Sequence, residues 1–169
     1  YTGSVTPSAA TGGTFTASNY NITYTAGNII VGQAALTITA NNASKTYGAT
    51  ASLTQFTATG LVNSDAVSAV TLSSTGSPAT AAVGTYPITA SNAIGTGLGN
   101  YTITYNNGTL TVNPAVLTIT ANNASKTYGA TASLTQFTAT GLVNSDAVSA
   151  VTLSSTGSPA TAAVGTYQI

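Results

Sequence analysis

The stretch LTITANNASKTYGATASLTQFTATGLVNSDAVSAVTLSSTGSPATAAVGTY occupies residues Leu36–Tyr86 and decides how the whole chain is organised. The same 51 residues occur again, without a substitution, at Leu117–Tyr167. The offset of 81 residues also holds upstream, because Asn19–Tyr24 matches Asn100–Tyr105 at all but one position. This period exceeds the roughly 20–50 residues of a solenoid coil. It suits a small independent domain, so we expect domains arranged in tandem.

The repeat divides the chain into three parts. We interpret them as the C-terminal part of one unit, a complete unit and the N-terminal part of a third unit, at residues 1–35, 36–116 and 117–169. Asn113 and Pro114 mark the boundary between the last two parts, and four residues separate Val112 from Leu117. Because proline restricts the backbone, this short linker is expected to hold consecutive units nearly in line. The chain starts at Tyr1 without a methionine or a signal-peptide pattern, so we interpret it as an internal piece of a longer protein.

Charge is almost absent from the sequence. The only charged side chains are Lys45, Asp65, Lys126 and Asp146, and there is no histidine or cysteine. One carboxylate per unit cannot assemble a metal site or an acid–base pair, and a serine nucleophile has no base to activate it. A neutral chain also lacks the basic surface that nucleic acids and anionic lipids require, and no apolar run reaches the roughly 18 residues of a membrane-spanning helix. We therefore expect no enzymatic activity, no metal or other cofactor, no nucleic-acid partner and no membrane insertion.

Alternation of apolar and polar residues predicts that each unit consists mostly of β-strands. Leu36–Ala40 alternates with the period of a half-buried strand. Tyr101–Tyr105 and Thr109–Val112 alternate in the same way on either side of Asn107 and Gly108. Asn-Gly between such segments predicts a hairpin whose tight turn has positive φ angles. Further strands are expected near three other segments: Leu53–Thr59, Ala69–Ser74 and Thr85–Ala90.

Three segments interrupt this alternation. Gly60–Val67 breaks it, so we expect a turn and one short helical turn with Asn63 or Ser64 as its cap. The phase also slips within Leu53–Thr59, which indicates a β-bulge. Gly95–Gly99 superficially matches a glycine-rich phosphate loop, but it lacks the strand–loop–helix context and the lysine, so a flexible turn is the better interpretation.

The single lysine and single aspartate of each unit are the candidate interacting residues. Lys45 with Asp65, and Lys126 with Asp146, could form a surface ion pair worth roughly 0–1 kcal/mol. Alternatively, the lysine could form an intramolecular isopeptide cross-link to one of the many asparagines, with the aspartate as proton shuttle. Such a bond would lower the intact mass by one ammonia.

Tyrosines and asparagines offer two further possibilities. Tyr20, Tyr24, Tyr101 and Tyr105 have the spacing of a strand face, which favours packing over a glycan-binding surface. Triplets of the glycan-attachment pattern Asn-x-Ser/Thr arise by chance in a chain so rich in these residues, and they occur at Asn21, Asn42, Asn100, Asn107 and Asn123. We therefore expect packing for the tyrosines, and Asn107 is better explained by its turn.

Several short motifs, taken in order, resemble the tandem MBG-type repeats, of the YGX kind, in large bacterial adhesins similar to filamentous haemagglutinin. The motifs are Leu36–Ala40, Lys45–Gly48, Gly60–Asp65, Val83–Tyr86 and Gly108–Val112, and the second copy carries Lys126–Gly129 and Val164–Tyr167. The chain departs from the family pattern at Ala49 and Ala130, where aspartate is common, and at Ser64, where glycine is common. The resemblance implies a secreted, cell-surface stalk or filament segment and supplies no catalytic residues. It implies either an all-β fold of small immunoglobulin-like sandwiches, which we favour, or a β-grasp-like sheet with one short helix per unit.

These features together predict a structural role. Copies of a small β domain joined by stiff linkers would form a stalk, spacer or fibre outside a bacterial cell, with neighbouring units or other copies of the chain as partners. The units could belong to one long covalent array. They could also assemble by strand addition, because the C-terminal part lacks the strands equivalent to Thr89–Val112 and the N-terminal part supplies them. The alternative function is a module that binds carbohydrate or a host glycoprotein. The absence of net charge favours association and predicts little salt dependence.

Overall fold

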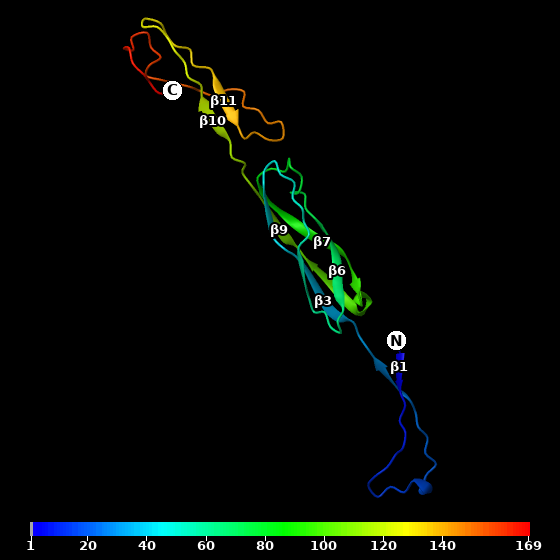
Figure 1. Ribbon diagram of the computed structural model, residues 1–169. Coiled ribbons are helices and arrows are strands. Elements are labelled where there is room, and N and C mark those ends of the chain that lie inside the picture. Colours follow the sequence, from blue (N-terminus) through cyan, green and yellow to red (C-terminus); the bar gives the residue numbers. More distant parts are fainter. Residues whose placement is uncertain (1) are drawn as a thin grey trace.

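The computed structural model describes residues 2–169 and shows three parts in a row along one long axis (Figure 1). Tyr1, where the first part begins, lies outside the described residues. Strands dominate, and the only helical segments within residues 2–169 are two 3-10 turns of three residues each, η1 (Ala17–Asn19) and η2 (Leu98–Asn100). The all-β prediction is therefore confirmed. The β-grasp-like alternative required one short helix per unit, and Gly60–Val67 forms none. No helix of the described chain is long and apolar enough to cross a membrane.

The complete unit is a β-sandwich of two sheets. The first sheet has the order β5–β3–β8, with bounds Phe56–Thr59, Ala34–Ala40 and Tyr101–Asn106. The second has the order β4–β9–β7–β6, with bounds Ala43–Thr46, Gly108–Asn113, Gly84–Thr96 and Ala66–Ser73. β3 pairs with β8 in parallel, β4 pairs with β9 in parallel, and the other pairs are antiparallel. The chain therefore passes from the first sheet to the second three times, at β3–β4, at β5–β6 and at β8–β9.

The hairpin predicted around Asn107 and Gly108 is wrong. β8 pairs with β3, whereas β9 pairs with β4 and β7 in the other sheet. Neither residue has a positive φ angle. Gly108 is required for another reason, because a Cβ atom there would lie 2.4 Å from the carbonyl oxygen of Ala40. The alternation in the sequence predicted both strands correctly, but alternation determines the faces of a strand and does not determine its partner.

The other predicted strands form with adjusted limits. Leu36–Ala40 lies within β3, and β7 extends past the predicted Thr85–Ala90 in both directions. β5 is shorter than predicted and begins at Phe56, so the change of phase near Leu53 falls outside the strand. The register shifts that the structure does show lie in β6, between Val67 and Thr71.

The segment Gly60–Val67 contains a tight turn and no helical turn. The Asp65 N–H donates to the Val62 carbonyl at 3.0 Å, and the two residues between them, Asn63 and Ser64, have φ angles of 56° and 62°. Positive φ at both central positions is the requirement of a type I′ turn. Asn63 and Ser64 are thus the centre of a turn, and the prediction that either caps a helix is wrong.

The core lies between the two sheets of the complete unit. The strand residues that alternate inwards are the buried ones: Leu36, Ile38, Ala40, Ile88, Ala90, Tyr101, Leu110 and Val112. Five of them are large aliphatic side chains with almost no exposed surface, and each such burial contributes about 1.5–3 kcal/mol. Both parallel pairs deliver residues to this core, so the sandwich closes only when β8 and β9 are present.

The two flanking parts each contain one pair of antiparallel strands (Figure 1). In the N-terminal part β1 (Thr2–Val5) pairs with β2 (Gly27–Ile30). In the C-terminal part β10 (Thr118–Ala121) pairs with β11 (Phe137–Thr140) in the same register as β3 with β5. The equivalents of β4, β6 and β8, at residues 124–127, 147–154 and 20–25, are not strands. In the complete unit these three strands pair with β9, β7 and β3, so each strand forms where its partner lies beside it.

Candidate functional site

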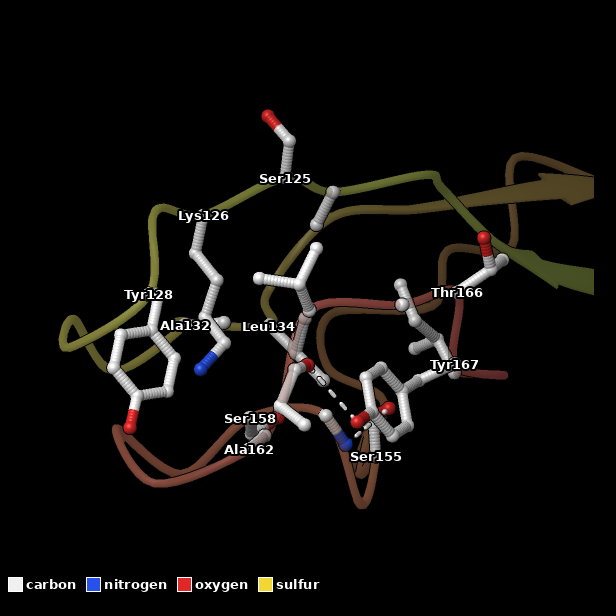
Figure 2. A pocket seen from close by; sticks show the side chains of 16 residues that line it. Ser125, Lys126, Tyr128, Ala132, Leu134, Ser155, Ser158, Ala162, Thr166 and Tyr167 are labelled. Atoms are coloured by element: carbon white, nitrogen blue, oxygen red, sulfur yellow. Dashed lines mark hydrogen bonds between the residues drawn. The ribbon is translucent and has the colours of Figure 1, made fainter.

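A hollow of about 310 Å³ opens into the C-terminal part (Figure 2). One side is formed by residues 124–126 and the other by residues 165–167 and Ile169. Leu134 and Tyr167 contribute apolar surface to its lining, and Lys126 lies at one end.

The complete unit shows what occupies the corresponding space. The equivalents of the two sides are Ala43–Lys45 in β4 and Gly84–Tyr86 in β7, and β9 lies between them. Leu110 faces Ala43 and Tyr86, and Val112 faces Lys45 and Gly84, with both apolar side chains fully buried. The hollow is therefore shaped for a strand with two apolar side chains two residues apart.

Identical residues differ in burial between the two copies. Leu36 and Ile38 have no exposed surface, whereas their equivalents Leu117 and Ile119 are each 44% exposed. The local sequence is the same, and the pairing of β10 with β11 repeats that of β3 with β5. The difference thus comes from the strands that cover the inner face in the complete unit.

The N-terminal part carries the complementary pair of strands. Val5 faces Gly27 in the way that Ile88 faces Gly108, so β1–β2 reproduces the pairing of β7 with β9. Ile29 and Val31 stand at the positions of Leu110 and Val112 and are 56% and 79% exposed. The chain therefore presents an apolar strand at one end and an apolar hollow for such a strand at the other.

Lys45 has a structural environment that the sequence did not reveal. Only 8% of its surface is exposed, and its Nζ donates to the carbonyl oxygens of Ala49 at 2.9 Å, Ser77 at 3.4 Å and Pro78. The three N–H groups of the ammonium thus have three acceptors, which joins β4 to the loop before β7. In the C-terminal part Lys126 repeats this arrangement with the carbonyls of Ala130 and Pro159.

Asp65 lies far from Lys45. Its Oδ2 accepts a hydrogen bond of 2.8 Å from the Tyr101 hydroxyl, which in turn accepts the Val62 N–H at 2.9 Å. This contact clamps the Val62–Asp65 turn onto β8. Burial, and secondarily the Asp65 carboxylate, raise the pKa of the Tyr101 phenol above its ordinary value, while the Val62 backbone hydrogen bond opposes the rise.

The predicted ion pair does not form within the complete unit. Lys45 lies beside Val112, which faces Gly84 at the start of β7, whereas the residue after Asp65 faces Thr96 at the end of β7. A strand of this length, at about 3.3 Å per residue, holds the two charges at opposite ends of the sandwich. The Lys–Asn cross-link stays a prediction, which the intact mass of the chain checks; the acceptors found at Lys45 Nζ are backbone carbonyls.

The remaining candidates have ordinary structural roles. Tyr101 belongs to the core, and the Tyr105 hydroxyl accepts the Ala93 N–H at 3.0 Å, so the packing interpretation is confirmed for both. It is wrong for Tyr20 and Tyr24, which are 65% and 43% exposed. Gly97 adopts a φ of 73° directly against the Asp65 carboxylate, but Gly95 and Thr96 end β7 and η2 begins at Leu98, so the turn predicted for Gly95–Gly99 is confined to Gly97 and η2. The asparagines of the glycan-attachment pattern are all exposed, at residues 21, 42, 100, 107 and 123.

The linker begins one residue later than predicted, because Asn113 belongs to β9 and Pro114 is the first residue after it. β9 ends at Asn113, whose carbonyl accepts the Tyr47 N–H at 2.8 Å, and residues 114–117 form no strand before β10 begins at Thr118. Sequence reasoning missed the Tyr101–Asp65 clamp because 36 residues separate its members. No short motif signals such a contact.

The fold and the hollow define a tandem-repeat protein. Each small β-sandwich is complete only when strands from the beginning and from the end of its unit are both present. The family model of the MBG domain (YGX type) matches residues 36–111 and 117–169, and the chain belongs to this family. The two matches begin at the first residues of the exact repeat. MBG domains are a repeat type found in surface proteins. No curated protein and no solved structure gives a significant match.

Proposed function

We propose that the chain is a stalk segment of an extracellular bacterial surface protein of the adhesin class, in which MBG domains serve as spacers. Family membership supports a surface location, since MBG repeats occur in surface proteins. The arrangement of three parts in a row supports a role in projection (Figure 1). In such a stalk each repeat adds length, and the packed core of each sandwich makes the unit stiff.

The inner surfaces of the flanking parts support a second step in this proposal. Where separate copies of the 169-residue polypeptide meet, residues 27–31 of one copy enter the hollow of another, parallel to residues 124–127 and antiparallel to residues 165–169. This is the geometry of β9 between β4 and β7. Such strand addition buries Ile29 and Val31, which are exposed in the single chain. This proposal rests on one main observation: the hollow lies at the position that β9 occupies in the complete unit.

The test is the mass of the polypeptide as a function of concentration, measured by light scattering with negative-stain microscopy alongside. We expect fibres that dissociate on dilution. Ile29→Asp should abolish them, because it places a charge at the position of the buried Leu110. Ile30→Asp is the matched control, since Ile30 is on the opposite face of the same strand and stands at the position of Thr111. Monomers at every concentration, or equal loss in both variants, would overturn strand addition.

Carbohydrate or host-glycoprotein binding, the alternative from the sequence, stays a prediction that a glycan array checks. In the complete unit the Tyr101 and Tyr105 hydroxyls are already engaged with the protein backbone and with Asp65. Tyr101 is buried and Tyr105 is half-buried, so neither ring is a fully exposed stacking surface, and the stalk is the function that we favour.

A further inference from the structure

The complete unit and the C-terminal part touch at a small contact beyond the linker. The Val143 side chain lies directly over Gly48, where an added Cβ atom would be 2.7 Å from Val143 Cγ2. The Asn144 side chain donates from Nδ2 to the carbonyl oxygen of Ala79 at 2.9 Å. One apolar contact and one hydrogen bond therefore connect consecutive units.

The receiving surface is built within the complete unit. The Gly48 N–H donates to the Ala79 carbonyl at 3.1 Å, which places the two residues side by side. Lys45 supports both flanks of this surface through its bonds to the carbonyls of Ala49 and Pro78. We name the surface formed by Tyr47, Gly48 and Ala79 the socket. These hydrogen bonds hold the backbone of the socket in place without any contribution from the next unit.

The part of the C-terminal part that contacts the socket is a tight turn. Asn144 and Ser145 have φ angles of 53° and 63° and form the same tight turn as Asn63 and Ser64 in the complete unit. The turn projects Val143 and Asn144 from the end of the C-terminal part. We name this pair of residues the plug.

The repeat supplies free copies of both surfaces for comparison. Gly129 has the φ angle of Gly48, 91°, and its N–H donates to Ala160 at 3.2 Å, but no atom lies within 4 Å of its Cβ position. Tyr128 is 68% exposed, whereas Tyr47 is half-buried. Val62 is 50% exposed, whereas Val143 is half-buried. Socket and plug thus keep the same backbone whether or not they are in contact.

We propose that the socket and the plug form a joint between consecutive MBG units, so that the Tyr-Gly turn of each unit is the docking surface for the next unit of the same chain. Both surfaces lie within the exactly repeated residues, so every unit carries a socket at one end and a plug at the other. A contact of this head-to-tail kind propagates along an array. Together with the Pro114 linker, the joint fixes the angle between units. A single linker would allow one unit to rotate relative to the next, and the second attachment prevents this rotation. The joint deepens the proposed stalk function and rests on it for its biological role.

The joint is tested by a distance distribution between two spin labels on the dilute, monomeric polypeptide. The chain has no cysteine, so Thr104→Cys and Thr140→Cys, both at exposed strand positions, label the complete unit and the C-terminal part specifically. In the parent chain, which carries only these two cysteine substitutions, we expect one narrow peak in the distance distribution. Val143→Asp and Asn144→Gly should each lose this narrow peak, because they remove the apolar contact and the hydrogen bond to Ala79.

Matched variants from the other copy serve as controls. Val62→Asp and Asn63→Gly make the same changes at the free plug, and both should retain the narrow peak. Gly48→Ala and Gly129→Ala introduce the same strain at a φ of 91°, but only Gly48→Ala meets Val143. The plug variants lie outside the complete sandwich, so their result stands even if Gly48→Ala destabilises its unit.

A broad distribution in the parent, or equal distributions in the Val143→Asp and Val62→Asp variants, would overturn the joint. These outcomes are distinct from a failure of the proposed function. A narrow peak in a polypeptide that never assembles contradicts strand addition and leaves the joint intact. A broad peak in a polypeptide that forms fibres contradicts the joint alone.

Discussion

Lys45 shows how one residue can serve a neutral protein without a charged partner. Its ammonium is buried and solvated by backbone carbonyls, which replace the water that it loses on folding. The result is a connection between β4, the turn after it and the loop that leads into β7. The lysine of the Lys-Thr-Tyr-Gly motif therefore supports the backbone of the socket, and the pairing with Asp65 expected from the sequence has no part in it.

Lys45→Met should lower the free energy of unfolding of the complete unit by about 1.5–3 kcal/mol, because buried carbonyls lose their charged donor. Urea unfolding followed by circular dichroism measures this change. Lys126→Met is the control from the C-terminal part, where the ammonium has two carbonyl partners and is more exposed. Equal effects of the two substitutions would contradict the role of burial.

At the scale of elements, the crossing of the chain between the two sheets decides the fold. β3–β4 and β8–β9 cross side by side, and Gly108 is the point at which the second crossing approaches the first. There a Cβ atom would collide with the carbonyls of Ala40 and Asn41. Because the obstacle is backbone, the strands themselves must move to relieve it. Glycine at this position permits the sandwich to close.

Gly108→Ala should therefore destabilise the complete unit by roughly 1–3 kcal/mol, the usual cost of overpacking a closed interior. The matched control is Gly27→Ala at the equivalent position of the N-terminal part, where no atom lies within 4 Å of the Cβ position. Midpoints of urea denaturation for both variants measure the difference. Two unchanged midpoints would show that the crossing has room for a side chain.

At the scale of the whole molecule, the same sequence occurs in two structural environments within the 169 residues. Residues 36–86 lie in a closed sandwich, whereas residues 117–167 form one strand pair and an open hollow. The joint and the linker place these parts in line (Figure 1). Neither the joint nor the sandwich core uses an ion pair, so we attribute little of the overall shape to electrostatics that salt would screen.

Hydrogen exchange with mass spectrometry should detect both states in a single experiment. Peptides from within the two copies are chemically identical, so each one reports on both places at once. In the dilute chain we expect two isotope envelopes of equal intensity, because the amides around Leu36 and Ile38 are protected and those around Leu117 and Ile119 are not. Assembly by strand addition should convert the fast envelope into the slow one. A single envelope in the monomer would contradict the open state.

Several features of the fold were accessible from local sequence. Alternation located β3, β7, β8 and β9, and Pro114 marked the linker, which begins one residue after the predicted Asn113. The turn at Asn63 and Ser64 was located but given the wrong geometry, because a polar pair that breaks alternation is compatible with a cap or with a type I′ turn. The candidate site was inferred only in outline, from the complementary strands of the two flanking parts.

The sequence by itself determined the repeat length, the all-β class, the positions of most strands and the shortage of chemically active side chains. These properties depend on residues close together in the chain. Only the tertiary structure decided that β8 and β9 join different sheets, that Lys45 is bound by the carbonyls of Ser77 and Pro78 and that the Tyr-Gly turn receives the next unit. Each of these depends on a partner far away in the sequence. The two copies show the physical reason, because backbone hydrogen bonds and apolar burial complete a strand only where a second strand covers it.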